Sequence, residues 1–134
     1  MSWTTPKTWA VGDPGTASDL NTYIRDNSAY LYGDTSWTAV TFQNSWANLA
    51  SYVTQYRRLG ATVALAGAAT GGTAATVAFT LPVGYRPAAK CNFAPATSSS
   101  TICYVQVATT GTVTINGISS GAWVAFDGIE LSLI

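Results

Sequence analysis

The chain has 134 residues, enough for one domain with a small appendage, and a chain of this size buries roughly two thirds of its surface without metal or disulfide support. Six basic and six acidic residues cancel, and charged residues make up only 9%, so the basic surface that nucleic-acid binding requires is not expected. Histidine is absent and carboxylates are sparse, which removes the common general base, most zinc sites and any plausible catalytic pair. We therefore expect a non-enzymatic protein without cofactor or metal.

Residues 1–15 predict an extended arm. Trp3 and Trp9 lie among prolines and glycines, and no helical or strand period runs through them. Exposed aromatic side chains are costly, so both tryptophans are expected to be docked, either as an anchor on another protein or on the chain's own domain. The segment lacks the basic and apolar regions of a signal peptide, and no stretch approaches the ~18 apolar residues of a membrane span.

Residues 16–32 predict the one convincing helix. Thr16 and Asp19 have the spacing of a capping box, and Gly33 is placed to end the helix. A narrow stripe follows with 4-3-4 spacing and contains Leu20, Ile24, Asn27 and Leu31. Such a stripe favours a helix–helix seam in which a polar Asn27 fixes register, although a helix packed on the edge of its own sandwich has the same pattern.

From Trp37 onward the sequence predicts about eight short strands separated by turn signals. The predicted strands cover 37–42, 55–59, 62–66, 76–81, 90–94, 102–107, 113–115, 123–126 and 129–133. Of these, 55–59 and 62–66 form either two short strands or one bent strand. Residues 43–53 are expected to form a loop and residues 67–73 a turn. The last two strands are expected to form a hairpin, with Asp127 as a turn residue. We predict a mainly β protein, an antiparallel, jelly-roll-like sandwich over 35–134, preceded by an arm and one α-helix over 1–34.

Residues 81–87 predict a rigid corner between two half-buried strands. Pro82 ends the preceding strand, Gly84 permits a tight turn, and Pro87 forces Arg86 into an extended conformation.

Two further sequence features need a structural explanation. Cys91 and Cys103 both alternate with apolar residues, which indicates two buried free thiols, with a cross-strand disulfide as the alternative. The adjacent Arg57 and Arg58 are expected on opposite strand faces, one of them pairing with an acid across an interface.

Several segments carry a resemblance to a known family. The segment 9–13 followed by 16–27 resembles an N-terminal segment common in small virion proteins of tailed bacteriophages. The segments 56–60, 63–67, 81–87 and 111–115, with Trp123 and 127–129, are similar to the β-sandwich of tail-fibre tips and related head-surface proteins. The resemblance implies a trimeric, non-enzymatic structural protein that belongs to the virion and is assembled in the host cytoplasm.

Three functions follow from this resemblance and from the aromatic content. The favoured one is a trimeric capsid decoration protein, with Trp3 and Trp9 anchored on the major capsid protein. The alternative is a tail-fibre or tail-tip receptor-binding module that contacts tail components and a host surface glycan. A carbohydrate-binding module is a third, if Trp46, Tyr52 and Trp123 are exposed together as sugar platforms. None of the three requires nucleic acid or a membrane as a partner.

Overall fold

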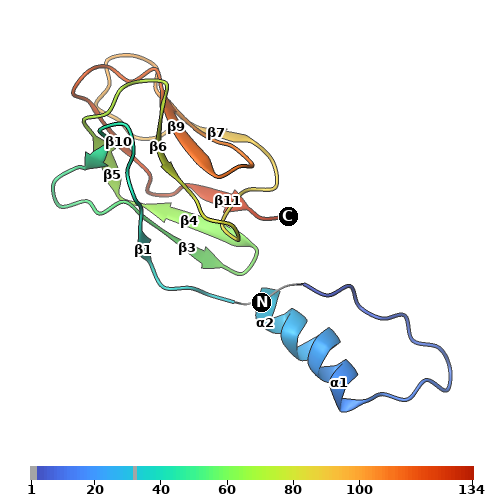
Figure 1. Ribbon diagram of the computed structural model, residues 1–134. Helices are drawn as coiled ribbons and strands as arrows, with labels where there is room; N and C mark the ends of the chain where they lie inside the picture. The colour runs from blue at the N-terminus through green and yellow to red at the C-terminus, as the bar shows by residue number, and fades with distance from the viewer. Residues whose placement is uncertain (1–2, 32) are drawn as a thin grey trace.

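The computed structural model describes residues 3–31 and 33–134, and it places an arm and a helix before a sandwich of short strands (Figure 1). One helix runs through α1 (Ala17–Leu20), a π-helical segment η1 (Asn21–Asp26) and α2 (Asn27–Leu31). Its predicted start is confirmed. The Thr16 hydroxyl oxygen accepts from the Asp19 amide at 3.1 Å, and the Asp19 carboxylate accepts from the Thr16 amide at 3.3 Å. Residue 32, the predicted last helical residue, lies outside the described residues.

The π-helical segment was not predicted, and two hydrogen bonds of Asn27 mark its end. Its Nδ2 donates to the Tyr23 carbonyl at 3.3 Å, the acceptor that a regular α-helix reserves for the backbone amide of Asn27. That amide bonds to the Ile24 carbonyl instead. Asn27 therefore interrupts the regular i to i−4 backbone ladder at the end of the π-helical segment.

Eleven strands follow in the part of the chain that the structure describes. They are β1 (Thr38–Ala39), β2 (Ala47–Asn48), β3 (Gln55–Leu59), β4 (Thr62–Ala66), β5 (Ala68–Thr70), β6 (Thr76–Thr80), β7 (Cys91–Phe93), β8 (Tyr104–Val107), β9 (Thr112–Asn116), β10 (Trp123–Ala125) and β11 (Glu130–Ser132). Every pairing is antiparallel, and the strand orders are β1-β3-β4-β11, β10-β5-β2 and β6-β9-β8-β7.

The first two of these sheets are two halves of one bent layer. Strands β4 and β5 are separated only by Gly67, and they pair with β11 and β10, which are separated by the break around Asp127. Gly67 has φ +95°, and a side chain there would collide with the Val53 carbonyl. The prediction of a turn over 67–73 is therefore wrong in part, because β5 continues β4 beyond a glycine kink. The predicted hairpin of 123–126 with 129–133 is also wrong, because these strands pair with β5 and β4.

The sheet β6-β9-β8-β7 forms the second layer, and the apolar core lies between the layers. Phe79 of β6 packs edge-on against Phe126, which follows β10 in the opposite layer, with ring centroids 5.4 Å apart. Both side chains are fully buried, as are residues at alternating positions of β4, β8 and β9. The predicted antiparallel β-sandwich is confirmed.

The predicted corner at 81–87 is present and is stabilised by hydrogen bonds between its own residues. The Tyr85 amide donates to the Pro82 carbonyl at 3.1 Å, Gly84 has φ +94°, and Arg86 Nε donates to the Leu81 carbonyl at 2.9 Å. Leu81 and Pro87 are buried at its two ends. The corner therefore presents Tyr85 at the end of the sandwich where the helix approaches.

Both cysteines are free, as the first of the two sequence alternatives predicted. The β7–β8 register places Cys91 opposite Val107, so Cys103 has no cysteine across from it. Burial raises the pKa of both thiols, and the effect on Cys103 is partly offset by a hydrogen bond with Thr97. Protonated, partly or fully buried thiols contribute packing and are poor nucleophiles.

Candidate functional site

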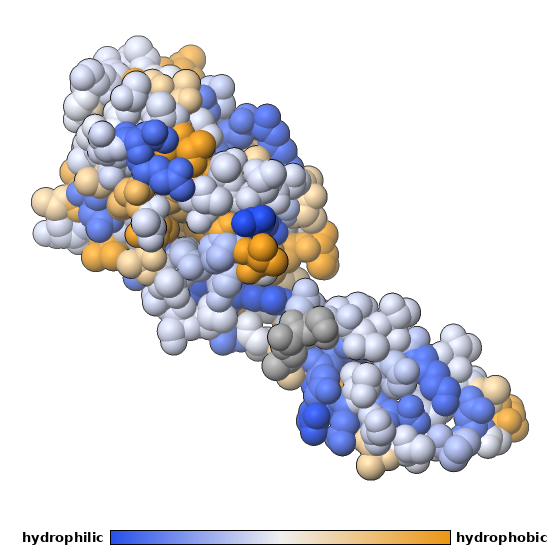
Figure 2. All heavy atoms as spheres, in the orientation of Figure 1, coloured by the Kyte–Doolittle hydropathy of each residue, from blue (hydrophilic) through white to orange (hydrophobic). Residues whose placement is uncertain are grey.

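The arm and helix, residues 3–31, form an extension at one end of the sandwich (Figure 1). The arm lies back along the helix. Asn27 Oδ1 accepts from the Thr4 amide at 2.9 Å, and Asn27 Nδ2 donates to the Thr4 carbonyl at 2.7 Å. Trp3 packs against Tyr30, with ring centroids 6.5 Å apart. Figure 2 shows the visible face of the extension as largely hydrophilic to neutral, with a hydrophobic spot at its tip.

The two arm tryptophans are only half covered by these contacts. Trp3 and Trp9 remain 47% and 45% exposed, and Lys7 Nζ lies 4.4 Å from the centre of the Trp9 ring. The arm thus packs in part on its own helix and leaves aromatic surface free. An anchoring role for Trp3 and Trp9 stays a prediction.

The predicted seam residues do not share one environment. Leu20, Ile24 and Leu31 are 51%, 59% and 40% exposed, whereas Asn27 is only 4% exposed. The polar atoms of Asn27 are bonded to Thr4 and Tyr23 of the same chain. Only the three apolar side chains therefore remain available to a neighbouring helix, and Asn27 holds the arm instead.

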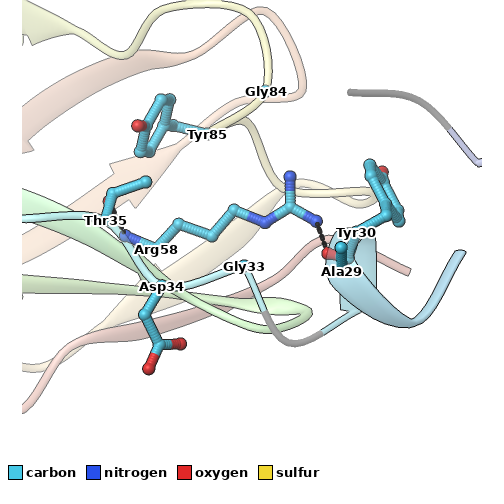
Figure 3. Close-up of a pocket in the computed structure, with 8 residues that line it drawn as sticks. All are labelled: Ala29, Tyr30, Gly33, Asp34, Thr35, Arg58, Gly84 and Tyr85. Atoms are coloured by element: carbon cyan, nitrogen blue, oxygen red, sulfur yellow. Dashed lines mark hydrogen bonds between the residues drawn. The ribbon is translucent and has the colours of Figure 1, made fainter. Parts of the chain in front are cut away.

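The junction between helix and sandwich is built around Arg58 of β3 (Figure 3). Its Nη2 donates to the Tyr30 carbonyl at 3.1 Å, its Nε donates to the Gly60 carbonyl at 2.7 Å, and its guanidinium lies 4.4 Å from the centre of the Tyr30 ring. A cation at a helix C-terminus satisfies free carbonyls and complements the helix dipole. Gly60 admits this approach, because a Cβ there would lie 2.7 Å from the Leu31 carbonyl oxygen.

A hollow of about 300 Å³ lies beside the junction around Arg58, and the eight residues of Figure 3 line it. The Arg58 side chain spans it from β3 to α2, and the Asp34 carboxylate points away from the guanidinium. Because Arg58 is already committed to backbone carbonyls, the hollow is a structural joint and offers no free charged group to a ligand.

Arg57 points to the other face of β3, as alternation predicts. Its guanidinium lies 4.6 Å from the centre of the Trp37 ring, and its buried Nε has no hydrogen-bond partner among the described residues. Neither Arg57 nor Arg58 pairs with an acid within residues 3–31 and 33–134, and the expected pairing across an interface stays a prediction.

A second pocket, here called the aromatic pocket, has a volume of about 360 Å³. It is lined by Leu49, Tyr52, Ala68, Ala96, Trp123, Ala125 and Asp127. Two of the three aromatic residues considered as sugar platforms, Tyr52 and Trp123, thus come together. The third does not join them: Trp46 is 4% exposed, its indole N–H donates to Thr76 Oγ1 at 3.1 Å, and its ring covers Gly72.

Asp127 lines the aromatic pocket, and it is held there by a hydrogen bond to the kink at Gly67. At the break between β10 and β11, its Oδ1 accepts from the Gly67 amide at 2.9 Å, which satisfies a donor that the kink removes from the ladder. The Phe126 amide donates to the Gly67 carbonyl at 2.8 Å and closes the same break. The sequence prediction that Asp127 is a turn residue is confirmed, since the Ile129 amide donates to the Phe126 carbonyl at 3.1 Å, but the position of Asp127 in the aromatic pocket was not predicted.

The remaining chemistry is limited in the part of the chain that the structure describes. It contains no cluster of three residues that could hold a metal ion and no helix long and apolar enough to cross a membrane. The two ion pairs found there join exposed neighbours, Lys7 with Asp13 and Arg25 with Asp26. The features left for contact with other molecules are the exposed apolar side chains of the extension and the aromatic pocket of the sandwich.

Neither protein-family models nor the curated proteins give a match to this sequence. Among solved structures, the chain is similar to the receptor binding protein (gp15) of Listeria phage PSA, with a TM-score of 0.61, 18% identity, and coverage of 88% of this chain and 80% of that chain. The sandwich starts at residue 35 and makes up about three quarters of the sequence, so the match extends into the arm and helix. At this identity the likeness shows a shared fold.

Proposed function

We propose that the chain is a receptor-binding component of a bacteriophage tail. The observation that carries this proposal is the likeness in fold, over most of both chains, to a phage receptor binding protein. The sequence resemblance to small virion proteins of tailed phages points to the same class. The proposal replaces capsid decoration, the function first favoured from sequence, because no comparison supports a place on the capsid.

The layout of the molecule supports a division of labour. The extension lies at one end of the sandwich, whereas β5 and β10, which carry part of the aromatic pocket, lie at the end away from it (Figure 1). A protein attached to a particle through its extension would direct the far end outward. The half-exposed Trp3 and Trp9 then contact neighbouring tail components, and the sandwich meets the host surface.

The component assembles as a homotrimer through its helices. A helix of this length is marginal on its own, and its apolar residues Leu20, Ile24 and Leu31 are exposed in the single chain. Three copies that bring these stripes together would remove them from water and stabilise the helix by tertiary packing. A trimer also multiplies weak single-site binding to a repetitive host surface.

Gold-labelled antibodies on intact particles of the phage that encodes the chain test the location. We expect gold at the tail tip, and gold spread over the head would overturn the proposal in favour of capsid decoration. The purified chain should also bind host cells and compete with the phage for adsorption. Failure to bind cells, with gold absent from the tail, would contradict a receptor-binding role.

Deleting residues 2–15 tests the direction of attachment. The shortened chain should keep its fold, its trimeric state and its binding to host cells, but it should no longer be incorporated into particles. A full-length variant with Tyr104→Ala, an exposed aromatic residue of the sandwich, is the matched control and should be incorporated normally. Unchanged incorporation of the shortened chain would place the anchor in the sandwich.

A further inference from the structure

We infer that the aromatic pocket binds a saccharide unit that carries no phosphate or carboxylate group. The inference rests on the proposed function, and it names the ligand class and the side chains that recognise it. Three properties of the pocket lead to it: aromatic walls, the sign of its charge, and a backbone that is fixed before the ligand arrives.

The aromatic walls suit the apolar faces of a sugar ring. Tyr52, 51% exposed, and the partly buried Trp123 both line a hollow of about 360 Å³, near the lower end of the roughly 300–1,000 Å³ typical of small-molecule pockets. The faces of aromatic rings carry partial negative charge, so they attract the weakly positive C–H groups on a pyranose face. Tyrosine also offers a hydroxyl group to the polar edge of such a ligand.

The charge of the pocket determines which sugars fit. Asp127 provides the only charged group among the seven lining residues, and no lysine or arginine is among them. A carboxylate accepts strong hydrogen bonds from hydroxyl groups, but it repels phosphate or carboxylate groups. One oxygen of Asp127 accepts from the Gly67 amide, and a carboxylate has further acceptor positions that a ligand hydroxyl can use.

The backbone beneath Trp123 is held in place by hydrogen bonds from a neighbouring loop. The Trp123 amide donates to Ser98 Oγ at 3.0 Å, and its carbonyl accepts from Thr97 Oγ1 at 2.6 Å. The Ala125 amide donates to the Ala96 carbonyl at 2.9 Å. Such pre-organisation lowers the entropic cost of binding, and the small alanine side chains leave the hollow open.

A proline-rich peptide is the competing occupant, because aromatic-lined grooves also receive polyproline helices. The carboxylate favours the saccharide, since a polyproline segment has no backbone amide or hydroxyl to donate to Asp127. The pocket also lies beside the kink between strands, and its volume of about 360 Å³ is that of a local hollow, which suits a single sugar ring better than an extended peptide.

Ligand-induced change in tryptophan fluorescence of the full-length chain tests the inference. The probes are glucose, galactose, rhamnose and N-acetylglucosamine, together with galacturonate, glucose 6-phosphate and a decaproline peptide. We expect at least one of the four uncharged sugars to bind with a Kd on the order of 1 mM. Galacturonate, glucose 6-phosphate and the peptide should not change the fluorescence.

Three variants locate the binding site. Tyr52→Ala and Asp127→Asn should each weaken sugar binding roughly tenfold, and Asp127→Asn keeps an oxygen for the Gly67 amide. Tyr104→Ala, which removes an exposed aromatic residue outside the pocket, should bind like the wild type. Circular dichroism of each variant verifies that the fold is retained, and saturation-transfer NMR provides a second measurement of binding.

Two results would overturn the inference: no response to any uncharged sugar, or a response that Tyr52→Ala and Asp127→Asn leave unchanged. A response to decaproline alone would also overturn it and assign the pocket to a peptide. These outcomes are separable from failure of the proposed function. If the wild type and the Tyr52→Ala variant bind host cells equally well, the aromatic pocket is not the receptor site, whereas the receptor-binding role of the chain is retained.

Discussion

The sandwich and the N-terminal extension are held together by different interactions. Every buried apolar side chain among the described residues lies between Trp46 and Leu131, whereas Asn27, a polar residue, is the one buried residue of the described extension. The sandwich has a closed core of its own. The extension has a capped helix, a polar contact between arm and helix, and exposed apolar side chains. From this contrast we expect the sandwich to fold by itself, and a partner that covers the apolar side chains of the extension stays a prediction.

The largest effect on stability should come from the core of the sandwich. Phe79 packs against Phe42 and Phe126, with ring centroids 6.1 and 5.4 Å away. Phe79→Ala should lower the free energy of unfolding by about 3–5 kcal/mol, because it removes a buried aromatic side chain and leaves a cavity. Denaturant unfolding followed by fluorescence measures this loss. If Ile24→Ala lowers the free energy of unfolding by a similar amount while the chain is monomeric, the extension has an apolar core of its own and does not differ from the sandwich in this respect.

The next effect concerns assembly rather than unfolding. Replacing both Leu20 and Ile24 by Gln should weaken trimer formation by at least about 100-fold, because burial of each side chain contributes roughly 1.5–3 kcal/mol. Light scattering over a concentration series measures the change. Thr22 and Ser28 lie on the same helix, and changing them to Gln provides a control for added polar bulk. If the wild-type chain stays monomeric at micromolar concentration, the proposal that the helices form a trimer through Leu20, Ile24 and Leu31 is wrong.

The sequence predicted well those features that depend on residues close together in the chain. The capping box of Thr16 and Asp19 spans three residues. Of the two alternatives for 55–66, two short strands and one bent strand, the structure has the two strands, β3 and β4, which are adjacent in sequence. The corner at 81–87 follows from its own prolines and glycine in the same way. Such features depend on local backbone geometry, which residue types indicate directly.

Features that depend on distant contacts could not be predicted from the sequence. Asn27 was placed in a helix seam because its spacing fits, but its partner Thr4 lies 23 residues away. The kink at Gly67 is closed by Asp127, 60 residues away, so the glycine-rich stretch was taken for a turn although β5 continues β4. Asp127 does lie in a turn, as predicted, but its bond to Gly67 could not be read from its neighbours in sequence. The aromatic pocket depends on the same kink. Local pattern therefore predicted most of the strands but not β2, which lies in the predicted loop 43–53, or β5, which lies in the predicted turn 67–73. These two strands pair with each other, and β5 pairs with β10, so they depend on tertiary pairing that the local pattern does not show.

A smaller, local effect is expected where the arm meets the helix. Asn27→Ala removes both hydrogen bonds to Thr4, and it should destabilise the arm contact by roughly 1 kcal/mol while the sandwich is unaffected. Amide hydrogen exchange at Thr4 should become faster, and proteases should cut residues 3–15 sooner. Asn21→Ala, an exposed change on the same helix, is the control. Equal protection of Thr4 in both variants would show that Trp3 and its neighbours hold the arm without Asn27.

The smallest effect is the response of the helix start to acid. Hydrogen bonds from the Thr16 side chain, and then from its backbone amide, lower the pKa of the Asp19 carboxyl. A lowered pKa in the folded state means that the stabilisation is fully present above the ordinary pKa of an aspartate and is lost as the pH falls through the lowered value. The first helical turn should therefore be unchanged between pH 5 and 8 and should fray only in stronger acid, which NMR carbon shifts of residues 17–20 can follow. Thr16→Ala should move the Asp19 pKa back toward its ordinary value, whereas Thr22→Ala should leave it where it is. If the Asp19 pKa is the same in all three chains, the capping box does not stabilise the charged carboxylate, and the helix start depends on packing against its partners.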